Sequence, residues 1–214
     1  MGKVFCVLTG DLLGSTKAGA AAVEASFATL RACFSRFEQV WTGADTRFTR
    51  YRGDGWQALI ADPSHAPQLA LHVISALKSQ SGTAETRIAV GYGRVDHIGT
   101  QDLADAHGDA FLASGKALDA MPRGQVLALA GDGITDLHRA LALLIGERTQ
   151  KWSREQAEAV SLALSPTQPM QADIASRLGI TVQAVNARLT SAGYQTLRQA
   201  LDLWQANDRE SHHG

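Results

Sequence analysis

The chain has 214 residues, of which 45% are hydrophobic and 19% charged, as in an ordinary globular protein with one large domain or two small ones. A formal net charge of -1 excludes a generally basic nucleic-acid coat, so any DNA contact has to come from a local surface. Two cysteines without metal-like spacing predict buried, reduced thiols, and the absence of a long apolar run predicts a cytoplasmic protein outside the membrane.

The first informative stretch covers residues 7–16 and reads VLTGDLLGST. An apolar run ends at Asp11, a Gly-Ser-Thr turn follows, and a helical pattern then occupies residues 18–41. A carboxylate at a strand end, beside the free amides of an opening helix, predicts a place for a metal ion and a phosphate.

The next elements alternate between strand and helix patterns. Strands are predicted at residues 3–8, 46–52, 56–61, 86–95 and 125–130, and helices at 18–41, 63–77 and 108–121. The second and third strands are joined by Gly53-Asp54-Gly55, which indicates either a plain tight turn or a functional acid.

This order predicts an α+β fold, namely an α/β sandwich with helices on one face of a mostly antiparallel sheet. It is a ferredoxin-like core with an extra unit. The end of the first strand and the hairpin are then neighbours. Asp11 and Asp54 are therefore expected to approach each other, as two carboxylates that share Mg²⁺ or Mn²⁺ must do.

Four motifs in residues 3–130 resemble those of the class III nucleotidyl cyclases. They are GDLLGST, RYRGDGWQALI, TRIAVGYGRV and DAHGDAFLASGKALD, in the family's order and spacing. RGDGWQ together with GDAFLASGKALD resembles the small bacterial SatD-like proteins still more closely, which look like a branch of that fold. Residues 1–131 are thus expected to form a cyclase-like nucleotide-binding domain.

The resemblance implies roles for individual residues. Asp11 and Asp54 would be the metal carboxylates, and Lys116 would be the catalytic residue if the site is active. The nucleotide-binding residues would be Leu12, Leu13, Gly14, Ser15, Thr16, Arg50, Asp105 and Lys116, with Arg50 and Asp105 reading the purine.

Two positions depart from the cyclase pattern. Leu112 stands where a cyclase has a ribose-orienting Asn, and Lys116 where it has an Arg that stabilises the pentavalent phosphorus. Loss of one transition-state donor commonly costs about 2.7–4 kcal/mol. The pattern therefore favours nucleotide binding over efficient turnover.

The last third reads as helical. Residues 132–152 are expected to hold a connecting helix (134–146) and a polar linker beginning at 147, and residues 153–214 a small all-α domain. Its helices are predicted at 153–164, 171–178, 182–191 and 196–204. Gly179 suits the tight turn, and the shared core is expected to hold Ile174, Leu178, Ile180, Val185 and Leu189. This pattern resembles a helix-turn-helix, and the alternative is a plain helical hairpin used for packing or dimerisation.

If this domain binds DNA, its second helix lies in the major groove. Thr181, Gln183, Asn186 and Arg188 are predicted to face outward and read bases, while Arg177 and Arg198 contact the phosphate backbone.

Three hypotheses follow for the whole chain. The first is a homodimeric transcriptional regulator that binds double-stranded DNA and senses a purine or cyclic nucleotide, with Mg²⁺ or Mn²⁺ as the expected metal. The second is an active purine nucleotidyl cyclase that makes a cyclic mononucleotide. The third is a DNA-binding protein whose first domain only dimerises.

Overall fold

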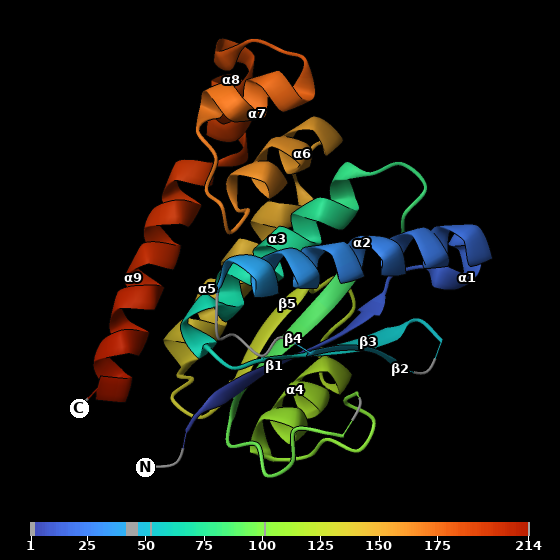
Figure 1. Ribbon diagram of the computed structural model, residues 1–214, viewed down its shortest axis with the longest axis vertical. Helices are drawn as coiled ribbons and strands as arrows, with labels where there is room; N and C mark the ends of the chain where they lie inside the picture. The colour runs from blue at the N-terminus through green and yellow to red at the C-terminus, as the bar shows by residue number, and fades with distance from the viewer. Residues whose placement is uncertain (1–2, 42–46, 52, 101, 214) are drawn as a thin grey trace.

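The computed structural model describes residues 3–41, 47–51, 53–100 and 102–213, with side chains described as far as residue 206 (Figure 1). The first part of the chain contains β1 (Phe5–Leu12), α1 (Ser15–Ala18), α2 (Ala20–Val40), β2 (Arg47–Tyr51), β3 (Gly55–Ile60), η1 (Pro63–His65), α3 (Ala66–Ser79), β4 (Thr86–Gly93), α4 (Asp109–Asp119) and β5 (Leu127–Gly131). The predicted limits of the second strand, residues 46 and 52, lie outside the described residues.

The five strands form one sheet in the order β2-β3-β1-β4-β5. β1 lies at the centre and pairs antiparallel with both β3 and β4, whereas β5 pairs parallel with β4. The first four strands with α2 and α3 have the ferredoxin-like arrangement, and α4 with β5 is the added unit. The predicted mixed α+β class is therefore confirmed.

Helices cover both faces of this sheet, and the prediction that they share one face is wrong. α2 and α3 lie on one face and α4 lies on the other, as Figure 1 shows. Alternation along β1 explains the difference, because Leu8 points into the core under α2 and α3 while Val7 packs with Phe111 of α4. Gly91 lets α4 come close, since a Cβ there would stand 2.3 Å from the carbonyl oxygen of Ala110.

The rest of the chain is helical. It contains α5 (Asp136–Gln150), α6 (Arg154–Ala163), α7 (Gln171–Leu178), α8 (Val182–Ala192) and α9 (Tyr194–His213). α5 runs further than predicted and takes up residues 147–150 of the expected linker, because Gly146 packs against Val126 and Leu127 instead of ending the helix. No helix among the described residues combines the length and apolar character needed to cross a membrane.

The C-terminal helices pack on the first part of the chain. Leu71 of α3 belongs to the same buried cluster as Trp152, Val160, Ile174 and Leu189. Two buried polar residues of α3 add hydrogen bonds to this contact. The amide of Gln68 donates to the Leu164 carbonyl oxygen at 3.0 Å, and His72 Nδ1 lies 2.9 Å from that of Ser161.

α9 returns from α8 toward the sheet, beside the N-terminal end of α3 (Figure 1). The Trp204 ring lies 4.9 Å from the His138 ring of α5 and 6.0 Å from the Tyr92 ring of β4, measured between centroids. Gln205 also donates to the side-chain oxygen of Gln68 at 3.1 Å. The last helix is thus longer than the predicted 196–204 because its continuation has a surface to pack on.

Candidate functional site

Asp11 lies near the end of β1, where the sequence predicts a metal ligand. The β1–β4 register places it opposite Arg87, whose Nε and Nη2 atoms each donate to one carboxylate oxygen of Asp11 at 2.8 Å. Both side chains are about three-quarters covered by protein. The hydrogen bonds from Arg87 to Asp11 raise the pKa of the guanidinium, so Arg87 remains a cation.

Asp54 lies in the hairpin between β2 and β3, beside the end of β1. Its neighbour Gly55 pairs with Asp11 in the β1–β3 register, so the two acids occupy adjacent strand ends as predicted. The Ser15 hydroxyl donates to the Asp54 carboxylate at 2.5 Å, which ties the turn after β1 to the hairpin. The Asp54 side chain therefore also anchors the turn at the start of α1.

The backbone around this corner differs from the expected phosphate cradle. The Leu12 amide donates to the Asp54 carbonyl oxygen at 3.1 Å, and the Leu13 amide donates to the Glu85 carbonyl oxygen at 2.7 Å. These two amides are therefore already bonded within the protein. The helix that opens beside Asp11 is the four-residue α1, preceded by Gly14 with a φ of 68°, and the chain turns again at Gly19 before α2 begins. Thr16 lies exposed in α1.

Arg50 and Asp105, the predicted pair for reading a purine, have separate partners. Arg50 donates to Glu24 of α2 at 2.6 Å, and its guanidinium lies 4.1 Å from the centre of the Phe27 ring. Asp105 accepts from the Thr100 hydroxyl at 2.8 Å and from the Thr100 amide at 3.1 Å. Those bonds hold the pKa of Asp105 at about 2. Each of the two side chains therefore has its own partners within the protein, and no direct bond between them is present among the described residues.

Both residues of α4 that differ from the cyclase pattern are exposed to solvent. Leu112 of α4 is 60% exposed, and Lys116 one turn later is also exposed. α4 buries the opposite side, where Ala110, Phe111 and Ser114 face β1 and β4. An exposed leucine offers no hydrogen bond to a ribose, and Lys116 offers a single point charge.

The corner as arranged does not fit a divalent metal ion. Mg²⁺ and Mn²⁺ need several oxygen ligands that are free to coordinate, and both oxygens of Asp11 are bonded to Arg87. Among the described residues, no group of three or more His, Cys, Asp or Glu side chains is positioned to hold a metal. Coordination at Asp11 would first have to displace a bidentate guanidinium.

The predicted helix pair is present at the other end of the molecule. α7 begins and ends at the expected residues, α8 extends one residue further, and Gly179 between them has a φ of 64°. The Thr181 hydroxyl accepts from the Ala184 amide at 3.1 Å and begins α8. Ile174, Val185 and Leu189 are buried in the shared core as predicted, and Leu178 and Ile180 pack against it.

The six residues expected to contact DNA fall into two groups. Thr181, Gln183, Asn186 and Arg177 are exposed. Arg188 instead pairs with Glu158 of α6 at 3.0 Å. Arg198 pairs with Asp202 and donates to Gln68, so it braces α9 against α3. The outward surface of α8 is therefore polar and uncharged at the positions Thr181, Gln183 and Asn186.

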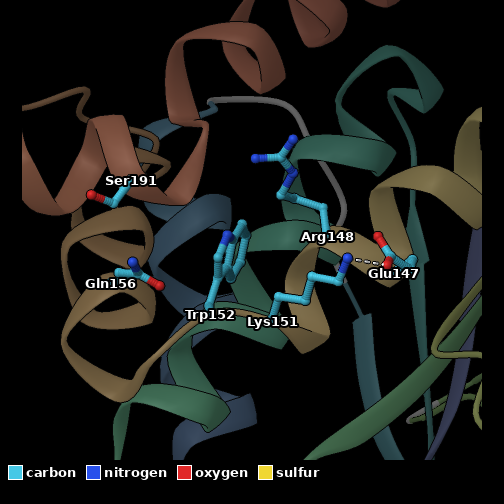
Figure 2. Close-up of a pocket in the computed structure, with 6 residues that line it drawn as sticks. All are labelled: Glu147, Arg148, Lys151, Trp152, Gln156 and Ser191. Atoms are coloured by element: carbon cyan, nitrogen blue, oxygen red, sulfur yellow. Dashed lines mark ion pairs between the residues drawn. The ribbon is translucent and has the colours of Figure 1, made fainter.

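A pocket of about 320 Å³ lies where α5 meets α6 and α8 (Figure 2). Its lining residues are Glu147, Arg148, Lys151, Trp152, Gln156 and Ser191. The Trp152 indole is buried and donates to the Ala192 carbonyl oxygen at 2.9 Å, which fixes the end of α5 to the end of α8. Figure 2 shows the Arg148 side chain extending past this indole, above the Lys151–Glu147 ion pair.

No protein-family model and no curated protein matches the chain. It is similar to solved structures of nucleotidyl cyclase domains. One is an adenylate cyclase from Trypanosoma brucei in its monomeric state, 13% identical, which covers 59% of this chain and 73% of that one with a TM-score of 0.47. Another is the dimeric guanylyl cyclase domain of the RhoGC fusion protein from Blastocladiella emersonii, 16% identical, covering 60% and 79% with a TM-score of 0.46.

A further similar structure is the active GGEEF domain of a diguanylate cyclase from Vibrio cholerae, 15% identical, covering 62% of this chain and 85% of that one with a TM-score of 0.42. At such identities and scores, the functional reading depends on this chain's own residues. Sequence reasoning missed two of them, Arg87 and Arg148. Nothing in the sequence near Arg87 marks it as a partner of Asp11, because the β1–β4 register brings the two together.

Proposed function

We propose that the protein is a homodimeric DNA-binding regulator whose first part binds a purine or cyclic nucleotide as an effector. The observation that carries the DNA-binding half is the outward surface of α8. Gln183 and Asn186 are exposed there, while the opposite side of the helix is buried through Val185 and Leu189. Their side-chain amides suit bidentate contact with adenine.

The surroundings of α8 support the same reading. Gly179 and the Thr181 cap give a short, defined turn between α7 and α8, and the shared core holds the two helices at a fixed angle. Arg177 is exposed on α7, where a cation suits a phosphate contact. With Arg188 and Arg198 engaged inside the protein, one copy has few cations for the DNA backbone. Useful affinity therefore needs two copies on one operator.

The nucleotide half of the proposal rests on the motifs around Asp11 and Asp54 and on their position at adjacent strand ends. Ser15, Gly14 and the exposed Lys116 are the groups we assign to the phosphates. Arg87 bonds both carboxylate oxygens of Asp11, so we propose that the effector binds directly to protein side chains and amides without a metal ion. Mg²⁺ or Mn²⁺ would bind at Asp11 only if this ion pair opens.

A gel shift over a genomic fragment library tests the DNA-binding half. The wild-type protein should retain a subset of fragments against competitor DNA. Replacement of Gln183 and Asn186 by Ala should weaken retention at least tenfold, since each bidentate pair contributes about 1–3 kcal/mol of discrimination. Gln199→Ala, at an exposed position of α9, is the matched control. If no fragment is preferred, the regulator proposal fails.

The nucleotide half is tested separately by thermal shift with ATP, GTP and their cyclic forms. A ligand at about a hundred times its dissociation constant should add about 2.7 kcal/mol of stability. Incubation with ATP or GTP and Mn²⁺ tests the cyclase alternative. Arg87, Leu112 and Lys116 lead us to expect binding without turnover, and a cyclic product that disappears in Asp54→Ala would contradict that expectation.

A further inference from the structure

α5 presents an apolar stripe to solvent. Leu137 is 82% exposed and Leu144 is 69% exposed, and Ala140 and Leu141 lie between them on the same side of the helix. The other side of α5 is buried against β5 through Ala142, Gly146 and Thr149. A helix with one face in the core and a second apolar face of this spacing is suited to pack against another helix.

The charges at the two ends of α5 differ. Asp136 pairs with Arg139 at 2.6 Å near the start, and Glu147 pairs with Lys151 at 2.5 Å near the end. Asp132, in the turn before α5, has no side-chain partner among the residues that the structure describes. Arg148, which lines the pocket near the end of α5, likewise has no acidic side-chain partner among those residues (Figure 2).

We propose that the occupant of this stripe is a second copy of the same chain, with the two α5 helices packed antiparallel about a two-fold axis. The stripe from Leu137 to Leu144 is centred between residues 140 and 141. Leu137 of one copy then faces Leu144 of the other, and the turn that carries Asp132 faces Arg148. A two-fold interface must be self-complementary in this way. A parallel pairing would set Asp132 against Asp132 and Arg148 against Arg148.

The helix dipoles favour the same orientation. In an antiparallel pair, the positive N-terminal end of each α5 lies beside the negative C-terminal end of its partner. The proposed function requires a dimer without specifying its surface, and the α5 stripe supplies one that needs neither nucleotide nor DNA. The interface can therefore be tested in the absence of both, and its failure leaves the DNA and nucleotide assays unaffected.

Sedimentation equilibrium of the full chain, without ligands, is the experiment. The wild-type protein should sediment as a dimer, and Leu144→Glu should raise its dissociation constant at least tenfold while the far-UV circular dichroism stays unchanged. Leu112→Glu is the matched control, since that leucine is 60% exposed on α4, across the sheet. A monomeric wild-type protein, or a dimer that Leu112→Glu disrupts and Leu144→Glu leaves intact, overturns the proposal.

A charge exchange tests the orientation. Asp132→Arg and Arg148→Asp should each weaken the dimer by several-fold because each sets like charges against each other. The double variant should recover most of the loss, because the pair is restored with its signs reversed. Additive losses in the double variant would overturn the antiparallel arrangement. Stabilisation of a monomeric wild-type protein by inorganic phosphate would instead assign the Arg148 pocket to an anion and overturn the dimer.

Discussion

Two guanidinium nitrogens bond both oxygens of Asp11, and this one contact decides what the strand-end acid is able to do. The site is partly open, with Asp11 28% exposed and Arg87 27% exposed. Water is therefore near enough to exchange with the guanidinium, so an incoming cation competes directly with Arg87. We therefore expect Arg87, on the neighbouring strand β4, to be what keeps a cation away from the Asp11 carboxylate.

Replacement of Arg87 by Gln should raise the affinity of the protein for Mn²⁺ roughly tenfold. The reason is that a charged hydrogen-bond partner, which contributes about 1.5–3 kcal/mol, no longer competes with the cation. Isothermal titration with Mn²⁺ measures the change. Arg94→Gln, which removes an exposed arginine paired with Asp109, is the control and should have no effect. Equal Mn²⁺ affinity in the wild type and Arg87→Gln would show that Arg87 does not block the site.

His72 should make the protein less stable below neutral pH. Burial lowers the pKa of His72 to about 4 from an ordinary 6.5. Well above pH 6.5 the His72 ring is neutral in both the folded and the unfolded chain, so it causes no loss of stability. As the pH falls from 6.5 toward 4, the unfolded chain binds a proton and the folded chain does not, so the free energy of unfolding decreases by at most about 3 kcal/mol.

Urea unfolding at pH 7 and pH 4.5 measures this loss. His72→Asn keeps a donor for the Ser161 carbonyl oxygen and cannot be protonated, so its stability should change less between the two pH values. His97→Asn, at a side chain that is 43% exposed, serves as the control and should keep the wild-type difference. The account of His72 is wrong if His72→Asn and the wild type lose the same stability.

At the scale of elements, two glycines should respond oppositely to the same substitution. Gly179→Ala should destabilise the protein by about 1–2 kcal/mol, because residue 179 has a φ of 64° between α7 and α8. Gly115→Ala should stabilise it by roughly 0.5–1 kcal/mol, since residue 115 lies within α4 and an added Cβ there meets no atom within 4 Å. Thermal unfolding compares them, and shifts of the same sign would contradict the local geometry.

Local patterns predicted most elements because the signals for them lie within a few residues. The spacing of Ile174, Gly179 and Val185 is sufficient to locate α7, the turn and α8. The placement of α4 across the sheet was missed, because it depends on which side of β4 presents Gly91 to a helix. The partners of Asp11 and Arg50 were missed for a related reason, since sheet register and the contact of α2 with β2 join residues far apart in the chain.

At the scale of the whole molecule, two leucines of α3 that are two residues apart are buried in different hydrophobic clusters. Leu69 lies in the cluster between the sheet and the helices α2 and α3, whereas Leu71 lies in the cluster of the C-terminal helices. Both leucines are fully buried. Each substitution by Ala should cost about 2–5 kcal/mol. Leu71→Ala should reduce amide protection mainly in α6 and α8, and Leu69→Ala mainly in β1 and β4.

Hydrogen exchange followed by mass spectrometry measures this difference. Identical protection losses in the two variants would mean that both clusters open together as one cooperative unit. Sequence patterns could not show this link, because they suggested a linker after residue 146 and gave no sign that Leu71 serves the helices beyond it.

The return of α9 to the sheet has a mechanical consequence for α7 and α8. This helix pair is fixed at both ends, on one side through α6 on α3 and on the other through Trp204 beside His138 and Tyr92. Because it is held at both ends, the α7–α8 pair cannot rotate about a single hinge. In the proposed regulator, a nucleotide signal from the sheet would therefore reach Gln183 and Asn186 as a small change in the tilt of α8, produced by sliding of α3 relative to α9.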